Sequence, residues 1–132
     1  MLAGTHPEGA HFKDTVIVPV PLSRLRLRER GFNQALEIAR PIARALALPL
    51  DATSLVRTRE TLPQSRLPWR ARQGNVRHAF ACSRDFSSLS VIVVDDVMTT
   101  GATLDAVART LKDHGATCVV NWVAARAVKM AT

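Results

Sequence analysis

The strongest constraint on the fold is a short apolar segment that ends in two aspartates. Residues 91–94 read Val-Ile-Val-Val, a continuous β-branched run, and Asp95 and Asp96 follow at once. A run without polar alternation is typical of a central parallel strand that is covered on both faces. Open α/β sheets bind their ligands at the carboxyl ends of such strands. The sequence therefore predicts an α/β protein with a binding site at the two aspartates.

A turn rich in small and hydroxyl-bearing residues follows the aspartates. Apolar residues then recur at helical spacing over residues 103–114 and predict an amphipathic helix that Gly115 closes. The N-terminus of a helix favours an anion through its unpaired N–H groups and its dipole. Hydroxyls and a permissive backbone at this position come from Thr99, Thr100, Gly101 and Thr103. The two aspartates, called the acid pair below, and the turn together indicate a ligand that carries a phosphate and either a polyol or Mg²⁺.

Two common nucleotide-binding motifs do not fit this turn. A Walker A loop requires G-x-x-x-x-G-K-[ST], and no lysine lies between Val91 and Leu111. A dinucleotide fingerprint requires G-x-G-x-x-G, whereas this turn holds a single glycine. The remaining alternative is an ordinary strand, turn and capped helix in which both aspartates are solvated.

The rest of the chain alternates strand and helix patterns, which predicts a mostly parallel sheet flanked by helices. Asn33 can cap a helix that runs to about Leu48, and Pro41 inside it should kink the helix axis. The other expected strands cover residues 15–20, 54–57, 76–80 and 118–125. Residues 1–14 show no periodicity, and we expect a loose or truncated lead-in there, followed by one domain over residues 15–132.

Composition limits the classes of function. The chain has 132 residues, 47% of them hydrophobic, and a formal net charge of +7 that comes mostly from arginine. This charge suits an anionic ligand, and nucleic acid fits it equally well. The sequence has neither an apolar run of membrane-spanning length nor a signal-peptide pattern, so we expect a cytoplasmic protein without a membrane partner. Cys82 and Cys118 lack metal-ligand spacing and are expected to be free thiols.

A basic stretch follows the first expected strand. Arginines stand at the alternating positions 24, 26, 28 and 30. Residues two apart cannot share one side of a helix, so the pattern predicts a loop or an extended turn. Gly31 then permits a tight backbone just before a helix N-terminus, which is again an anion-binding geometry. A solvated basic loop is the alternative.

The segment Val91–Thr103 resembles the phosphoribosyl pyrophosphate (PRPP) motif of type I phosphoribosyltransferases. The resemblance implies that Asp95 and Asp96 hold the ribose 2′- and 3′-hydroxyls. It assigns the 5′-phosphate to Thr99, Thr100, Gly101, Ala102 and Thr103. The basic stretch resembles the pyrophosphate loop of these enzymes, which implies a second anion site at Arg28, Arg30, Gly31 and Phe32.

A long irregular segment, residues 57–84, is rich in arginine, proline and amide side chains. Loops of this length in a compact domain are usually functional or disordered. The functional interpretation is a lid that closes over pyrophosphate and excludes water. Its expected lid residues are Arg66, Arg70 and Arg72. The alternative is a solvated excursion with Trp69 pinned to the body of the protein.

Motifs in one continuous order over residues 15–127 resemble the ComF family, phosphoribosyltransferase-like proteins associated with DNA uptake in competent bacteria. The motifs are Val-Pro-Val-Pro, Arg-Glu-Arg-Gly-Phe-Asn-Gln-Ala, Pro63-Gln64, Arg72 with Asn75, Phe80, Val-Asp-Asp-Val-Met-Thr-Thr-Gly-Ala-Thr and the final Ala-Ala-Arg-Ala. Family members commonly carry an N-terminal zinc ribbon and a hood region, and neither pattern is present here. We therefore expect the hood to be missing or truncated.

The resemblance implies displacement of pyrophosphate from C1 of PRPP by a nitrogen nucleophile, with Asp95, Asp96 and Arg30 as the catalytic residues. Mg²⁺ is the expected cofactor, held through the substrate or by the two aspartates. Two alternatives remain open: a non-catalytic sensor of PRPP or a nucleotide, and a single-stranded nucleic-acid binder in which Trp69 stacks on a base. The expected partners are PRPP or another phosphorylated ribose, nucleic acid or a competence-machinery protein, and a second copy in a homodimer.

Overall fold

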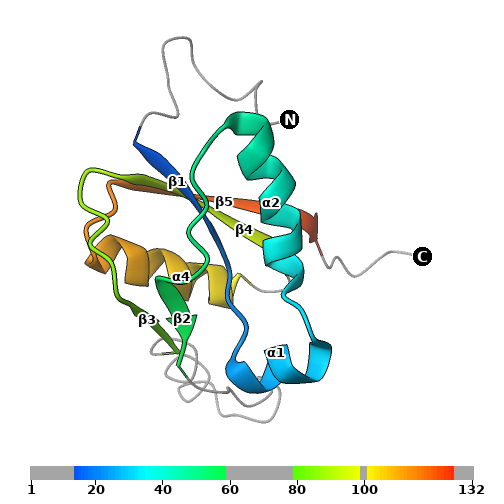
Figure 1. Cartoon of the computed structure of the whole chain (residues 1–132). Coiled ribbons are helices and arrows are strands. Elements are labelled where there is room, and N and C mark those ends of the chain that lie inside the picture. Colours follow the sequence, from blue (N-terminus) through cyan, green and yellow to red (C-terminus); the bar gives the residue numbers. More distant parts are fainter. Residues whose placement is uncertain (1–13, 59–78, 99–100, 127–132) are drawn as a thin grey trace.

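The computed structural model describes residues 14–58, 79–98 and 101–126 (Figure 1). In chain order the elements are β1 (Thr15–Pro19), α1 (Arg24–Arg30), α2 (Gln34–Leu46), β2 (Leu55–Arg57), β3 (Phe80–Cys82), β4 (Ser90–Met98), α4 (Ala102–Asp113) and β5 (Cys118–Arg126). Among the described residues, β1, β4 and β5 form a parallel sheet with β4 in the centre. β2 and β3 form a separate antiparallel pair. The expected α/β fold with a mostly parallel sheet is confirmed.

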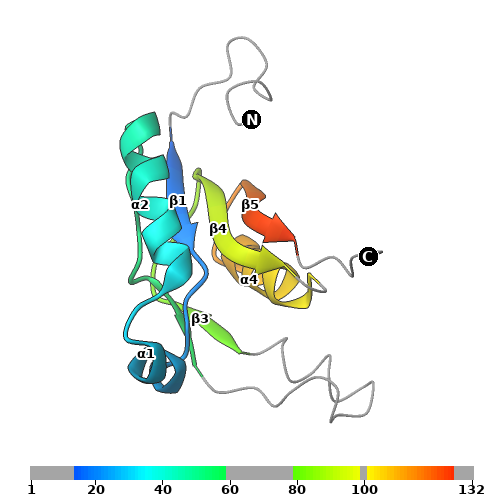
Figure 2. The same ribbon diagram turned by 90° about the vertical axis from the view of Figure 1, so that its right-hand side faces the viewer.

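Helix α2 covers one face of this sheet. Ala39 and Ala43 of α2 pack with Ile17 of β1 and with Ile92 and Val94 of β4. Figure 2 shows α2 running beside β1, on the opposite side of the sheet from α4. Because the alanine side chains of α2 are small, the helix can approach the strands closely.

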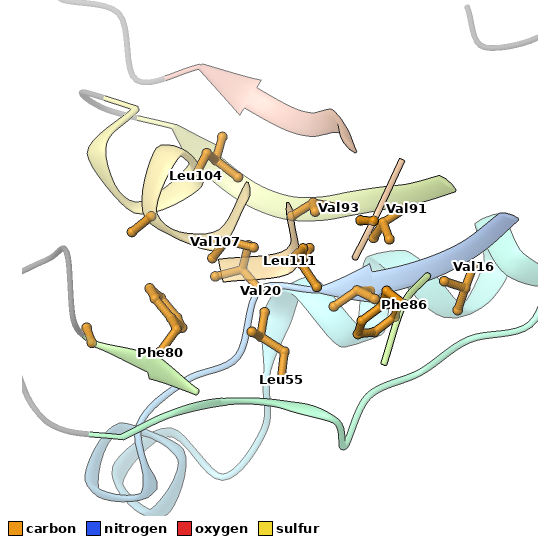
Figure 3. Close-up of a cluster of buried hydrophobic side chains, with 14 residues drawn as sticks. Val16, Val20, Leu55, Phe80, Phe86, Val91, Val93, Leu104, Val107 and Leu111 are labelled. Atoms are coloured by element: carbon orange, nitrogen blue, oxygen red, sulfur yellow. The ribbon is translucent and has the colours of Figure 1, made fainter. Parts of the chain in front are cut away.

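The opposite face of the sheet forms the larger cluster, which Figure 3 shows. Val91 and Val93 of β4 point to this side, because successive strand residues face opposite ways. They pack against α4, through Leu104, Val107 and Leu111, and against the β2–β3 pair. Burial of β4 on both faces explains why residues 91–94 are apolar without alternation.

The basic stretch at residues 24–30 is a helix, so the predicted loop or extended turn is wrong. The Ser23 hydroxyl accepts a hydrogen bond from the Arg26 N–H (3.2 Å) and caps the start of α1. Gly31 closes α1 in the left-handed conformation (φ 84°), and its N–H donates to the Leu27 carbonyl (2.7 Å). Every residue of α1 is exposed, so its arginines need not share one face.

The remaining predicted elements are present with small changes of boundary. The helix after Asn33 and the helix from residue 102 are confirmed as α2 and α4, and α2 continues through Pro41. The kink at Pro41 stays a prediction. β3 begins at Phe80, later than the strand expected over residues 76–80, of which 76–78 lie outside the described residues. Most of the lead-in, residues 1–13, also lies outside them.

Strand β4 is longer than the sequence indicated. It runs to Met98, and its pairing with β5 continues past the acid pair, with Asp95 opposite Val123 and Val97 opposite Ala125. The aspartates therefore lie inside the strand, near its carboxyl end. Cys82 and Cys118 are free thiols. None of the helices in the described ranges is both long and apolar enough to cross a membrane.

Candidate functional site

The carboxyl ends of β1 and β4 are joined by backbone hydrogen bonds that continue past β1. The Val20 N–H donates to the Val94 carbonyl (2.9 Å). The Val20 carbonyl in turn accepts from the Asn33 side-chain amide (3.1 Å), whose oxygen caps α2 by accepting from the Ala35 N–H (3.0 Å). Asn33 thus anchors the start of α2 to the edge of the sheet that carries the acid pair. The predicted helix cap at Asn33 is confirmed.

Asp95 and Asp96 are joined by a hydrogen bond. The Asp96 N–H donates to Asp95 Oδ1 (2.9 Å). The pKa of Asp95 is raised to about 7, chiefly by burial and then by the hydrogen bond and the negative charge of the Asp96 side chain, against the opposing backbone bond from Asp96. Two adjacent carboxylates, when ionised, can accept hydrogen bonds from two hydroxyl donors. A vicinal diol presents such a pair of donors.

Arg57 is a residue near the acid pair that the sequence analysis did not single out for this site. Its positive charge lowers the pKa of Asp95, in opposition to the burial and to Asp96. The Arg57 guanidinium also lies over the ring of Phe80, 5.3 Å from its centroid. Residue 57 comes near β4 only because the β2–β3 pair packs beneath the sheet. No local sequence signal reports such a contact.

The predicted phosphate turn leads directly into α4. Gly101 stands at the N-cap in the left-handed conformation (φ 85°), which glycine adopts without steric cost. Its carbonyl accepts from the Asp105 N–H (2.9 Å), which begins the helix. Ala102 and Thr103 form the first turn and are half-buried. Thr99 and Thr100 lie outside the described residues, so their predicted role stays a prediction.

The predicted pyrophosphate residues lie on α1 and just after it. Arg28 and Arg30 are exposed in its last turn. Gly31 ends the helix, and Phe32 is 48% exposed. Since α1 follows the carboxyl end of β1 and β1 runs parallel to β4, the two predicted anion sites lie at the same edge of the sheet but on different helices (Figures 1 and 2).

The predicted lid residues Arg66, Arg70 and Arg72 lie outside the described residues. Within the described ranges, no three His, Cys, Asp or Glu side chains come together in a metal-binding group. Mg²⁺ takes oxygen ligands and is usually held by one or two carboxylates together with substrate phosphates. Asp95 and Asp96 fit that mode of binding, since they provide two carboxylates beside a predicted phosphate turn.

Comparison with known proteins agrees with this architecture. The sequence pattern of the family described as "Phosphoribosyl transferase domain" matches residues 33–128, which include the acid pair and the phosphate turn. DNA utilization protein YhgH of Escherichia coli is 37% identical over 110 residues, covering 83% of this chain and 48% of YhgH. Competence protein F of Haemophilus influenzae is 34% identical over 114 residues, covering 84% of this chain and 50% of the relative.

Competence protein ComFC of Bacillus subtilis is 33% identical over 105 residues, covering 78% of this chain and 40% of ComFC. The chain therefore spans about half the length, or less, of the curated relatives it matches.

Proposed function

We propose a function for this chain from its family: it belongs to the phosphoribosyltransferase domain family as a ComF-type member. The proposed function is binding of PRPP with Mg²⁺ at the carboxyl end of β4. The observation that carries the proposal is the hydrogen-bonded pair of Asp95 and Asp96 near the carboxyl end of β4, the strand that leads to α4. The two carboxylates hold the ribose diol, and the turn at Gly101 receives the 5′-phosphate.

The proposed reaction transfers the phosphoribosyl group to a nitrogen nucleophile. The bond between C1 and the pyrophosphate oxygen breaks while a new C1–N bond forms, and the transition state carries positive charge on the ribose. Bound Mg²⁺ would neutralise charge on the leaving pyrophosphate. The protein's own task is to fix the ribose through Asp95 and Asp96 and to supply cations for pyrophosphate from Arg28 and Arg30.

A link to competence and DNA utilisation is part of the proposal. It is supported by the names of the relatives YhgH, competence protein F and ComFC.

Calorimetric titration of PRPP with Mg²⁺ tests the site. The wild-type chain is expected to bind, and the Asp95→Asn, Asp96→Asn double variant to lose at least about 100-fold in affinity, because two charge-assisted hydrogen bonds contribute about 1.5–3 kcal/mol each. The matched control is Asp85→Asn, Asp113→Asn, which removes the same charge from exposed positions and should bind like the wild type.

Absence of PRPP binding by the folded wild type would refute the proposal. Binding of single-stranded DNA that falls steeply with salt and ignores the Asp95→Asn, Asp96→Asn change would favour the nucleic-acid alternative instead.

A further inference from the structure

A pocket of about 840 Å³ lies between α1, α2 and β2. This volume is in the range of small-molecule sites, about 300–1,000 Å³. Its described lining includes neither Asp95 nor Asp96 nor the turn at Gly101, so it is distinct from the proposed ribose and 5′-phosphate site. Nothing in the proposed function uses this pocket as a whole.

Large apolar side chains that remain in water gather around this pocket. Leu25 is 49% exposed, Leu27 43%, Phe32 48% and Val56 46%, and all of them line it. Each leaves apolar surface hydrated at a cost of about 25 cal/mol per Å². Scattered exposed leucines are ordinary, but a contiguous group around one hollow marks an interaction site. The pocket therefore favours a ligand with an apolar, ring-sized body.

The neutral polar side chains of the lining already have partners within the protein. The Ser23 hydroxyl accepts from the Arg26 N–H (3.2 Å). The Asn33 side chain bonds the Val20 carbonyl and the Ala35 N–H. The Thr58 hydroxyl donates to the Ala79 carbonyl (3.0 Å). The charged side chains are therefore the stronger source of ligand selection by polarity.

The charged residues of the lining are mostly cationic. Arg24, Arg40 and Arg57 line the pocket together with one acid, Glu37. Arg40 and Glu37 form an exposed pair 3.8 Å apart, a geometry that contributes little stability and that a stronger anion can displace. Guanidinium groups recognise planar carboxylates and sulfonates through paired N–H donors. The net charge of the lining thus complements an anion.

We propose that the pocket between α1, α2 and β2 binds an aromatic small molecule that carries a negative charge. Phe32 and the leucines of α1 contact the ring, and Arg24 and Arg40 hold the anionic group. This site is additional to the proposed ribose and 5′-phosphate site, and it borders the predicted pyrophosphate residues at Gly31 and Phe32.

The probe for the test is 8-anilinonaphthalene-1-sulfonate, an anionic aromatic dye that fluoresces when its rings leave water. Titration into the full chain should show one saturable site. The Phe32→Ser and Arg40→Gln variants should each weaken binding about 10-fold. Matched controls are Val120→Ser, an exposed valine on β5, and Arg44→Gln, the next exposed arginine on α2; neither residue lines the pocket, and neither change should matter.

Circular dichroism and the thermal midpoint of each variant confirm that it is folded, since this dye also binds loosened proteins. Equal loss of binding in Val120→Ser, or equal binding of the uncharged analogue N-phenyl-1-naphthylamine, would overturn the proposal. Competitive displacement of the dye by inorganic pyrophosphate would also overturn it, by making the pocket part of the pyrophosphate subsite. The Asp95→Asn, Asp96→Asn variant should bind the dye normally, which separates failure of this site from failure of the PRPP site.

Discussion

Helices α1 and α4 both follow a strand of the parallel sheet, yet the protein holds them in different ways. The twelve-residue α4 buries Leu104, Ala106, Val107 and Leu111 against the sheet. All seven residues of α1 are exposed, and its ends are fixed by Ser23 and Gly31. Isolated helices of this length are marginal in water, so α1 depends on its caps whereas α4 depends on packing.

This contrast shows which functional groups are held in place by packing against the sheet. Gly101, at the start of α4, is held in place by a helix that packs on the sheet, as a site for a small phosphate requires. The arginines of α1 sit on an element that contributes little to the core, so their placement can adapt to a ligand. Changes in α4 should therefore affect stability strongly, while changes in α1 should affect binding with little effect on stability.

The largest expected effect is loss of a packed side chain in α4. Leu111→Ala should lower the free energy of unfolding by about 3 kcal/mol, because Leu111 is fully buried and its removal leaves a cavity. Leu27→Ala in α1 should lower it by less than about 0.5 kcal/mol. Urea denaturation measures both values. Equal losses would show that α1 is packed as firmly as α4.

The next comparison uses the glycine that follows each helix. Gly115 has φ +103°, and a Cβ there would lie 2.6 Å from the Ser87 hydroxyl oxygen and 2.8 Å from the Ser87 nitrogen. Gly115→Ala should therefore cost about 2–3 kcal/mol, from backbone strain and overlap. Gly31 has φ +84°, and no atom in the described part of the chain is within 4 Å of its Cβ position. Gly31→Ala should cost about 1 kcal/mol, and thermal unfolding distinguishes the two.

A third comparison concerns the N-caps of α1 and α2. Asn33→Ala should destabilise the protein by about 1.5 kcal/mol, because it removes the cap of α2 and leaves the Val20 carbonyl without its side-chain donor. Ser23→Ala removes the cap of α1 and should change global stability by about 0.5 kcal/mol, while it lowers the helix content of α1. Chemical denaturation together with NMR shifts of residues 24–30 separates global from local loss. A larger global loss for Ser23→Ala would contradict the contrast.

The smallest expected effect depends on pH. The pKa of Asp95 rises from 3.8 to about 7 on folding, so the folded state holds the proton more tightly. Its contribution to stability is therefore fully present below about pH 4 and is lost as pH rises through about 7. Asp95→Asn should stabilise the protein by about 1 kcal/mol at pH 8, after allowance for solvent screening, and by little at pH 5.

Stability measured at both pH values checks the sign of this effect. An equal gain in stability for Asp95→Asn at pH 5 and pH 8 would show that folding does not raise the pKa of Asp95. In the proposed function the ribose hydroxyls bind the ionised pair, so PRPP affinity of the wild type should rise over the same pH range.

The sheet and its buried helices could be predicted from sequence because their patterns are local. The apolar run at residues 91–94 predicts a strand that is buried on both faces, and the apolar spacing after Gly101 predicts α4. The error at α1 came from giving weight to the alternating positions of its arginines, which cannot share one face of a helix. That alternation matters only where one face is buried, and here the caps Ser23 and Gly31 decide the conformation.

The candidate site was only partly visible in the sequence. Asp95 and Gly101 belong to one contiguous motif, so their proximity follows from the chain itself. The influence of Arg57 on Asp95 depends on how the β2–β3 pair packs against the sheet. The pocket between α1, α2 and β2 likewise exists only because α1 is a helix, which the sequence analysis did not predict.

Gly101 has a further consequence for how ligand and fold are linked. As the N-cap of α4 it brings no side chain to the amides that open the helix, where serine or aspartate would supply an acceptor. A phosphate seated on this turn would complete the helix from outside, as an external cap. Hydrogen exchange at Thr103 and Leu104 should then slow on ligand binding more than exchange in the buried middle of α4. The ligand would take the place of the N-cap side chain that Gly101 lacks.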